Sequence, residues 1–342
     1  MARLSNLLGR RDEGGDRPDP GVRSLDCRPA RPDELDAALR LLLAGAGGLA
    51  SDEQVLEFLA FTNQRGVDVH DMWIASRQAA QPGPEQVEWA LLPLVSPGRT
   101  MLLLTPNRLL KRLTPPSSVR ALSDAVCAHF AQEGVQLAQL LLEPGQRDVR
   151  DVYTAAGFAE LAELVYLSRA VKRAPAEDDL ILSPGFDLVR YDPESPQVHD
   201  LFARTITASY QGSLDCPGLN GMRDMMDVLA GHKAAGEFDP KLWFALMEYG
   251  QPRAVLLLNK SLQSDALELV YLGLVPEARG RGLADWMMKL ALSCVAQSGR
   301  RELTLAVDAQ NAPALKLYFR HGMQRLMTRV AMLRDLRSAG RS

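Results

Sequence analysis

Helical and strand-like spacings of apolar residues follow one another in a similar order twice along the chain. In the first series two helices precede three strands, and a helix, a strand, a second helix and a final strand follow. The predicted segments are a helix opening at Pro32–Leu35, and then Asp52–Thr62, Met72–Ala75, Val87–Leu94, Met101–Leu104, Ser118–Gln132, Leu137–Leu142, Asp148–Ala156 and Leu161–Ser168.

The second series starts with a strand and then runs through two helices, three strands, and again helix, strand, helix, strand. Its segments are Phe186–Arg190, Val198–Ser209, Met222–Ala230, Leu242–Glu248, Arg253–Asn259, Leu267–Val275, Gly282–Ala296, Glu302–Val307, Ala312–Arg320 and Arg325–Leu333. Many α/β proteins show such an alternation. However, Val152–Phe158 and Leu317–Met323 both read helix, Tyr, Gly, apolar residue, strand, which favours a tandem duplication of one fold.

The repeated order predicts an α/β (α+β) chain of two domains, each a mixed, mostly antiparallel sheet flanked by helices. We expect a first domain at residues 26–170 and a second at 183–336. A charged, proline-containing linker spans 171–182. Residues 1–25 hold few large apolar groups and are expected to form a disordered tail, with a short tail at 337–342.

Composition narrows the class of protein. Of the 342 residues, 46% are hydrophobic and 24% charged, which is typical of a globular chain, and the formal charge of −3 disfavours a nucleic-acid partner. The four cysteines show no CxxC spacing, so we expect no metal site. The sequence shows no secretory signal and no apolar run long enough to span a bilayer, and a cytoplasmic protein without a membrane partner is therefore expected.

The most informative chemistry follows the apolar run Leu267–Val275. There the loop Arg279–Ala284 leads into a helix, and its glycines allow backbone N–H groups to point inward at the positive end of the helix dipole. This predicts an anion cradle of pyrophosphate size, to which Arg279 and Arg281 add charge. The loop matches neither the Walker nor the dinucleotide pattern. By itself it is not specific, because Arg and Gly are common at strand-to-helix turns.

The surrounding motifs are more specific. Val275–Ala278, the R-x-x-G-x-A loop at Arg279–Ala284 and the stretch Asn311–Gly322 (N-x-x-A-x-x-L-Y-x-x-x-G) together resemble the GNAT superfamily of acyl-CoA-dependent N-acyltransferases. The resemblance covers Leu267–Leu333 through these motifs and Phe186–Ala266 only through element order. It implies acetyl-CoA, or another acyl-CoA, as co-substrate.

The resemblance also implies roles for individual residues. Backbone N–H groups of the loop would hold the pyrophosphate, Leu274 and Val275 would pair with the pantetheine amides as an added strand, and Asn311 would touch the same arm. Tyr318 would lie near the thioester sulfur as the general acid. The implied cofactor-binding residues are Leu274, Val275, Arg279, Gly280, Arg281, Gly282, Leu283, Ala284 and Asn311.

For the general base we favour Glu268, which precedes Arg279 by eleven positions (279 − 268 = 11), a spacing similar to that of the strand glutamate in the histone-acetylating branch of the family. Strand alternation would place it on one face with Val270, Leu272 and Leu274. The alternatives are a solvated Glu268 at the end of a strand, a water chain, or Glu248 or Tyr271 as base.

The loop Tyr210–Gly221 falls where the family's variable acceptor-binding segment lies, although a plain connector would look the same. Cys216, within this loop, has no histidine near it in sequence and is not expected to be a nucleophile.

The first half lacks a counterpart of the anion-binding loop Arg279–Ala284. Its corresponding loop, Thr105–Pro116, has no Gly-x-Gly or Gly-x-Ala, and its prolines remove N–H donors. Arg108, Lys111 and Arg112 either meet phosphates in another way or form a solvated basic loop. We expect a degenerate copy that supports the second domain or walls its acceptor cleft.

The predicted function is an N-acyltransferase, with acetyl the expected group, acting on a small-molecule or protein amine in the C-terminal domain. The rival predictions are a non-catalytic acyl-CoA sensor or scaffold, and a structural tandem in which neither half binds a ligand. The acceptor, the acyl length and the oligomeric state are not encoded in any motif recognised in the sequence.

Overall fold

The structure is a computed structural model that describes residues 25–45, 47–64, 66–77, 86–110, 114–262 and 264–337. The expected tail before residue 25, the end of the chain after Arg337, and Lys111 and Arg112 therefore lie outside the described residues.

The N-terminal half contains four helices and six strands in its described part. They are β1 (Leu25–Pro29), α1 (Leu35–Leu42), α2 (Asp52–Gln64), β2 (Trp73–Arg77), β3 (Gln86–Ser96), β4 (Thr100–Leu104), α3 (Pro116–Gln132), β5 (Leu137–Leu142), α4 (Arg147–Ala155) and β6 (Ala159–Ala170). The sequence reading missed β1, a five-residue strand that pairs antiparallel with β2.

The C-terminal half repeats this order after the segment 171–182, in which Glu177–Leu180 forms a 3₁₀ turn. Its elements are β7 (Phe186–Arg190), α5 (Pro196–Ser209), α6 (Met225–Ala234), β8 (Trp243–Glu248), β9 (Gln251–Lys260), β10 (Ala266–Leu274), α7 (Leu283–Gln297), β11 (Glu302–Asp308), α8 (Ala312–Arg320) and β12 (Gln324–Asp335).

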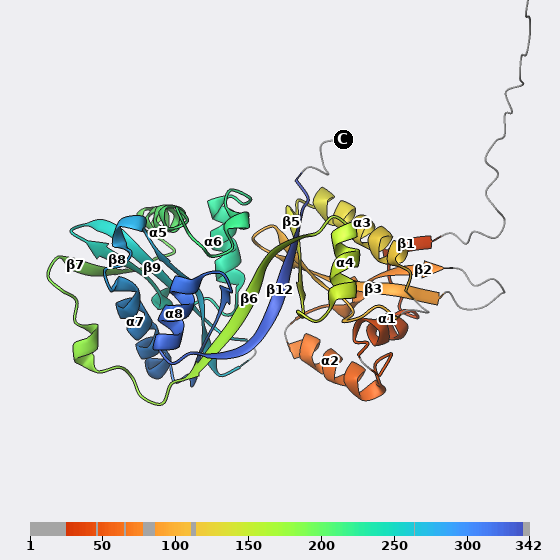
Figure 1. Cartoon of the computed structure of the whole chain (residues 1–342), viewed down its shortest axis with the longest axis horizontal. Coiled ribbons are helices and arrows are strands. Elements are labelled where there is room, and N and C mark those ends of the chain that lie inside the picture. Colours follow the sequence, from red (N-terminus) through yellow and green to blue (C-terminus); the bar gives the residue numbers. More distant parts are fainter. Residues whose placement is uncertain are drawn as a thin grey trace, which may run out of the picture.

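All twelve described strands belong to one sheet, in the order β1-β2-β3-β4-β5-β12-β6-β11-β10-β9-β8-β7. Only the pairs β4/β5 and β10/β11 are parallel. The mixed, mostly antiparallel sheet with flanking helices confirms the predicted fold class. Figure 1 shows this sheet running through both lobes, with β6 and β12 crossing at the middle.

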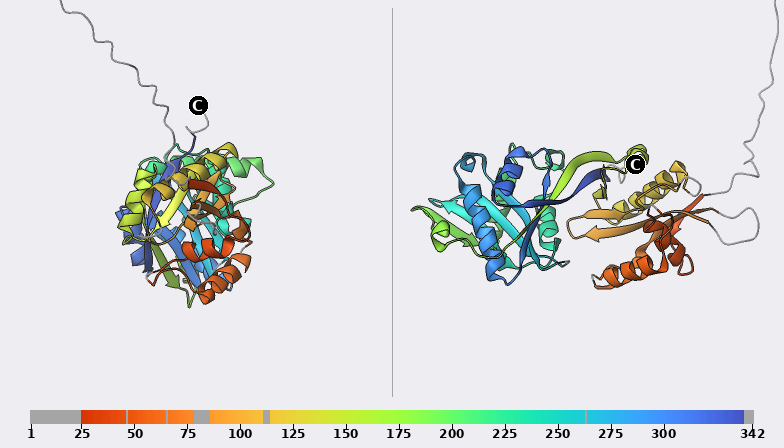
Figure 2. Two further views of the ribbon diagram at one scale, coloured as in Figure 1. Left: turned by 90° about the vertical axis from the view of Figure 1, so that its right-hand side faces the viewer. Right: turned by 60° about the horizontal axis from the view of Figure 1, so that its bottom comes forward.

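The last strand of each half completes the sheet of the other half. β6 pairs with β11 along Glu302–Asp308, and β12 pairs with β5 along Leu137–Leu142. β6 and β12 also pair with each other. The boundaries predicted along the chain thus describe two sequence repeats whose sheets share their central strands. Figure 2 shows the two lobes joined by this pair of strands.

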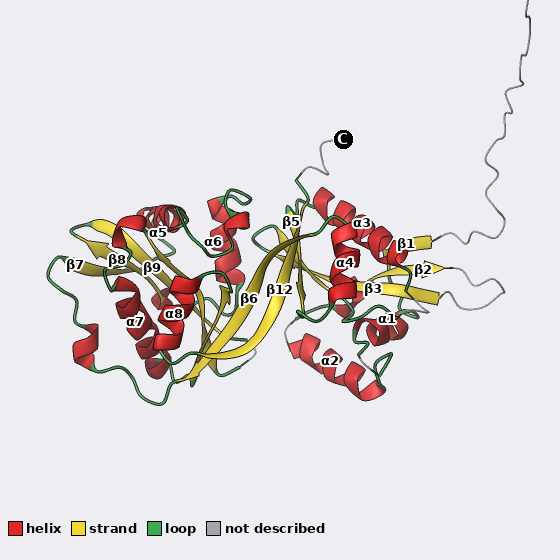
Figure 3. Ribbon diagram, in the orientation of Figure 1, coloured by secondary structure: helices red, strands yellow, loops and turns green. Residues whose placement is uncertain are grey.

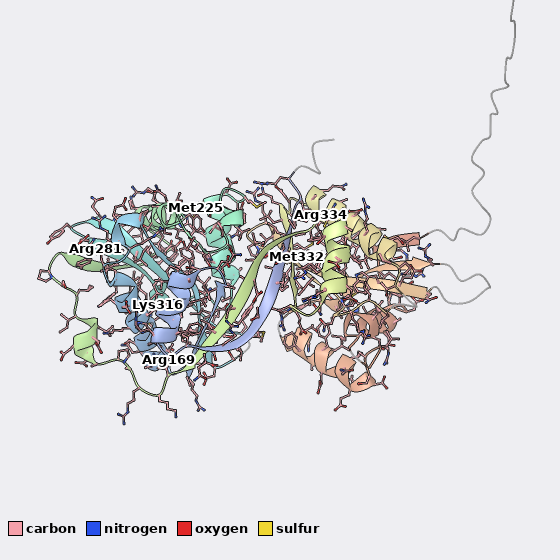
Figure 4. The ribbon with its side chains drawn as sticks, in the orientation of Figure 1. Arg169, Met225, Arg281, Lys316, Met332 and Arg334 are labelled. Atoms are coloured by element: carbon pink, nitrogen blue, oxygen red, sulfur yellow. The ribbon has the colours of Figure 1, made fainter. Side chains whose placement is uncertain are left out.

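Two arginines tie the exchanged strands to the halves that they enter. Arg334 of β12 donates to the Ala156 carbonyl at the end of α4 and to Asp124 of α3. Arg169 of β6 donates to the His321 carbonyl at the end of α8. Each arginine side chain lies beside a left-handed glycine, Gly157 or Gly322, and each stands twelve residues after the glycine of its own half (169 − 157 = 334 − 322 = 12). Figure 4 shows Arg169 and Arg334 at opposite ends of the crossing strands.

Helices cover both faces of the sheet in each half, as the secondary-structure colouring of Figure 3 shows. In the N-terminal half α3 and α4 bury one face and α1 and α2 the other. In the C-terminal half α7 and α8 bury one face, and α5 and α6 bury the other over β8 and β9. In the part of the chain that is described, no helix has the length and apolar character needed to cross a membrane.

Candidate active site

The strands β10 and β11 separate at the centre of the C-terminal half. They pair only from Ala266 to Leu269 on β10, so the rest of β10 has no partner on that side. At the same point β10 bulges, because Leu269 opposes Leu258 of β9 while Tyr271 opposes Leu257, and Val270 is the extra residue. The splayed strands leave the edge of residues 270–274 available to an extended, amide-bearing ligand.

The loop after β10 forms the expected nest of N–H groups. Gly280 and Gly282 have φ values of 73° and 80°, a left-handed conformation that costs other residues roughly 1–2 kcal/mol. The N–H groups of residues 280–284 make no backbone hydrogen bond within the described chain, and the last two belong to the first turn of α7. Because these donors converge at a helix N-terminus, the loop is suited to a phosphate group.

The splayed strands and the nest open into one cavity of about 630 Å³. Its wall includes Leu274, Arg279, Gly280, Gly282, Leu283, Ala284, Asn311 and Tyr318 among the residues singled out from the sequence. Val275, Arg281, Glu268 and Glu248 do not line it. The volume lies within the range of small-molecule and cofactor sites.

Tyr318 of α8 is buried at the wall of this cavity. Burial, and secondarily the charge of Asp215, raise the pKa of its hydroxyl, so it stays protonated at neutral pH. Its hydroxyl has no hydrogen-bond partner within the described residues, which leaves the proton available to a ligand. Asn311 also lies at this wall, and its side-chain oxygen caps α8 by accepting from Ala314 N–H.

Asp215 is a cavity residue that the sequence reading did not single out. The side chain faces the cavity, so part of its surface is accessible, but surrounding protein atoms raise the pKa of its carboxyl. It accepts from Asp308 N–H at 3.2 Å, and Cys216 N–H in turn donates to Asp308. Asp215 belongs to an irregular loop, and its position therefore had no periodic signal in the sequence.

Glu268 lies on β10 two residues before the bulge. The bulge changes the alternation, so Leu272 and Leu274 join Leu267 and Leu269 on the face covered by α7, while Glu268 stays on the opposite face. The expected shared face with Leu272 and Leu274 is therefore wrong. The carboxylate is partly buried, and this burial raises its pKa, as a base with a pKa nearer neutrality requires.

Glu248 and Arg281 are engaged with each other outside the cavity. Arg281 donates to both carboxylate oxygens of Glu248, and Arg253 donates at 2.8 Å. These hydrogen bonds, Arg281 first, lower the pKa of Glu248 to about 2, which makes it a weak base. In this arrangement the Arg281 side chain reaches a carboxylate, so only its backbone N–H belongs to the nest.

Arg279 uses its guanidinium to hold the loop that follows α5. It donates to the carbonyl oxygens of Leu274, Ser209 and Gly212. The end of α5 is thereby fixed against the end of β10, at the mouth of the cavity.

Tyr271 and Cys216 have environments that suit neither a base nor a nucleophile. The Tyr271 hydroxyl hydrogen-bonds to Ser209 at 2.8 Å, and burial raises its pKa. Burial, followed by the charges of Asp215 and Asp308, raises the pKa of the Cys216 thiol to about 12. The described residues bring no group of three His, Cys, Asp or Glu side chains into a metal-binding arrangement.

Comparison with known proteins places this site in a family. Residues 210–323, which contain the splayed strands, the nest and Tyr318, match the model of the acetyltransferase (GNAT) family. The C-terminal half therefore contains a GNAT-type region at residues 210–323.

One curated relative and two solved structures illustrate what the chain is similar to in sequence and in fold. A stretch of 178 residues is 28% identical to a mycothiol acetyltransferase from Gordonia bronchialis and covers 51% of this chain but only 56% of that protein. The fold resembles a GCN5-related N-acetyltransferase from Sphaerobacter thermophilus, with a TM-score of 0.55, 17% identity and coverage of 92% of this chain and 96% of that one. It also resembles the glucosamine N-acetyltransferase region of a fungal multi-domain β-N-acetylglucosaminidase, with a TM-score of 0.55, 13% identity and coverage of 92% and 38%.

Proposed function

We propose that the chain is an N-acetyltransferase that transfers the acetyl group of acetyl-CoA to an amine in the C-terminal cavity. The observation that carries this proposal is the meeting of three features in one cavity: the unpaired edge of β10, the nest at residues 280–284, and the buried Tyr318 hydroxyl. The nest suits the pyrophosphate and the edge suits the pantetheine amides. Both would direct the thioester toward Tyr318.

The residues of the chain then have distinct tasks. Glu268, which does not line the cavity, accepts through a water the proton that the amine must lose to become a nucleophile. The amine nitrogen forms the new C–N bond as the C–S bond breaks, and Tyr318 donates its proton to the departing sulfur. The proton that the acylated nitrogen must then lose passes through water to the Tyr318 phenolate and restores its hydroxyl. Asp215, a carboxylate of the cavity wall, lies close enough to Tyr318 to raise its pKa.

Thiol release from acetyl-CoA, measured across a panel of small amines and lysine peptides, tests this function. We expect amine-dependent release with formation of the N-acetyl product, and calorimetry should show acetyl-CoA binding to the unaltered protein. An absence of acetyl-CoA binding would reject the proposal entirely. Binding without turnover on every amine would instead support the alternative, a non-catalytic acyl-CoA sensor.

A further inference from the structure

A second, smaller cavity lies where the two halves meet. It has a volume of about 260 Å³ and is enclosed by the β3–β5 region of the N-terminal half and by α6 with the loop before it. Its polar lining consists of Ser96, Thr100 and Gln139 from one half and Arg223 and His232 from the other. Figure 1 shows α6 at this seam, beside the crossing strands, and Figure 4 labels Met225 at its first turn.

Arg223 supplies this cavity with an uncompensated positive charge. The side chain is partly buried, and it has no hydrogen bond or ion pair within the described residues. The neighbouring carboxylates Asp224 and Asp227 are paired instead with Arg99, from the β3–β4 turn of the N-terminal half. A guanidinium without a counter-ion in the described residues is available to donate charge-assisted hydrogen bonds to an anionic ligand.

His232 does not neutralise the positive charge that Arg223 brings to the cavity. Burial and the nearby Arg223 charge lower the pKa of its imidazole to about 4, so the ring is neutral at pH 7. Its Nε2 is enclosed without a hydrogen-bond partner in the described part of the chain. The ring also stacks on Tyr271, with centroids 5.4 Å apart, and Tyr271 lines the acetyl-CoA cavity. Stacked aromatic rings are thus a wall shared by the two cavities.

Strand register places the seam cavity and Glu268 on one face of the sheet. Leu102, Gln139 and Leu333 are aligned across β4, β5 and β12. Arg329, on the same face of β12 as Leu333, is opposite Leu164 of β6. Alternation along β6 then leads from Leu164 to Ser168, which is aligned through Thr304 with Glu268. The same face therefore runs from the seam to the candidate base.

We propose that the seam cavity is an acceptor subsite in which Arg223 binds a carboxylate, so that the amine substrate carries a carboxylate group. This inference rests on the function proposed above. One cation among neutral hydroxyl and amide groups suits a monoanion, and the shared face would let the ligand extend from Arg223 toward Glu268. The N-terminal half would then contribute to substrate recognition through Ser96, Thr100 and Gln139.

Matched amine pairs test the proposal. The distance between amine and carboxylate is varied with four amino acids, and each is assayed alongside its carboxamide. The four are glycine, β-alanine, 4-aminobutanoate and 6-aminohexanoate. We expect at least one acid to be acetylated with a higher kcat/KM than its amide. Arg223→Gln should lower kcat/KM for that acid by about 10- to 100-fold, as the loss of a charged hydrogen bond does, and leave the amide unchanged. Arg223→Lys should retain part of the activity, which separates loss of charge from misfolding.

Arg204→Gln is the matched control, because Arg204 is an exposed α5 arginine whose one ion pair among the described residues is with Asp200, and it should leave the acid-to-amide ratio unchanged. Equal rates for acid and amide, or an equal loss of both in Arg223→Gln, would overturn the proposal. A preference for O-phosphoethanolamine over every acid would replace carboxylate by phosphate and would also contradict it.

Binding separates this inference from the proposed function. Calorimetric titration with the N-acetyl derivatives of the four acids needs no turnover. Binding that is lost in Arg223→Gln supports the subsite even if no amine is acetylated. If none of the acids binds to a protein that does bind acetyl-CoA, the subsite is rejected while the proposed function stands.

Discussion

The two halves place a tyrosine at the same point of the repeated fold but use it differently. Tyr153 and Tyr318 each precede a left-handed glycine by four residues, at the end of α4 and α8 (157 − 153 = 322 − 318 = 4). The Tyr153 hydroxyl lies 2.6 Å from Thr105 Oγ and accepts from the Trp89 indole N–H at 3.2 Å. The Tyr318 hydroxyl has no partner within the described chain and lies at a cavity wall.

The loops near the two tyrosines also differ in whether their polar groups have hydrogen-bond partners. In the N-terminal half Gln146, which precedes α4, donates to the carbonyl and the side chain of Asn107 in the loop after β4. In the C-terminal half the corresponding loop offers free N–H groups around Gly280 and Gly282. Within the described residues, the N-terminal copy therefore pairs its tyrosine and its loop with protein groups, whereas the C-terminal copy leaves the corresponding groups unpaired.

The largest effect is expected from removing the N-terminal half of the chain. A fragment of residues 171–342 lacks β6, so β11 and β12 lose the strand between them and a row of backbone groups becomes unpaired. We expect the fragment to aggregate and to show no cooperative thermal unfolding. In the control, the full chain is cut by a protease site inserted within 171–182, which keeps β6. Its fragments should remain associated, and a soluble fragment 171–342 that binds acetyl-CoA would contradict the interdependence of the two sheets.

The next largest effect is expected from a charge placed in the nest. Gly282→Asp should weaken acetyl-CoA binding by at least about 100-fold, because like charges ~4 Å apart near a protein surface repel by about 4 kcal/mol. Gly250→Asp is the control: Gly250 also has a left-handed φ, of 74°, and open space around it, but lies in the β8–β9 turn. Calorimetry with both variants measures the difference. Similar affinities would mean that the phosphates bind elsewhere.

The sequence predicts those features of the fold and the site that are encoded by residues close together in the chain. The nest was predictable because six consecutive residues, Arg279–Ala284, carry both the glycines and the helix start. The element order was readable from apolar spacing, apart from the five-residue strand β1. The exchange of β6 and β12 could not be predicted, because either strand satisfies the alternation of both halves and only the three-dimensional packing selects the partner.

Side-chain directions in the site were less predictable. The bulge at Val270 shifts Leu272 and Leu274 to the other face, and the only sequence sign of it is the uninterrupted apolar run Leu269–Leu272. Asp215 reaches the cavity from a loop, for which no periodicity applies. The pairing of Arg281 with Glu248 joins residues 33 positions apart, on different elements.

The paired tyrosines allow a direct test of their two roles. Tyr318→Phe should lower kcat by about 100-fold, the lower end of what a general acid contributes, because a thiolate already leaves readily. Tyr153→Phe should leave kcat unchanged but lower the free energy of unfolding by about 1–3 kcal/mol, since Trp89 and Thr105 lose a buried partner. Steady-state kinetics and chemical denaturation of both variants give the result. A loss of kcat in Tyr153→Phe would show that the first copy takes part in catalysis.

The smallest effect expected concerns the pH dependence set by Glu268. Since burial raises the pKa of this carboxyl, the base is inactive when protonated, and kcat/KM should rise with pH through a pKa above that of an ordinary glutamate. Glu268→Gln should remove this rise and lower the plateau by roughly 10-fold, because a water can take over part of the role.

A raised folded-state pKa of Glu268 also means that the neutral form of the carboxyl stabilises the fold. This contribution is present below the ordinary glutamate pKa and is lost as pH rises through the folded value. Relative to the wild type, Glu268→Gln should therefore gain stability as pH rises from the ordinary glutamate pKa through the raised folded value, as measured by thermal unfolding against pH. An unchanged rate profile would favour a water chain or Asp215 as the base.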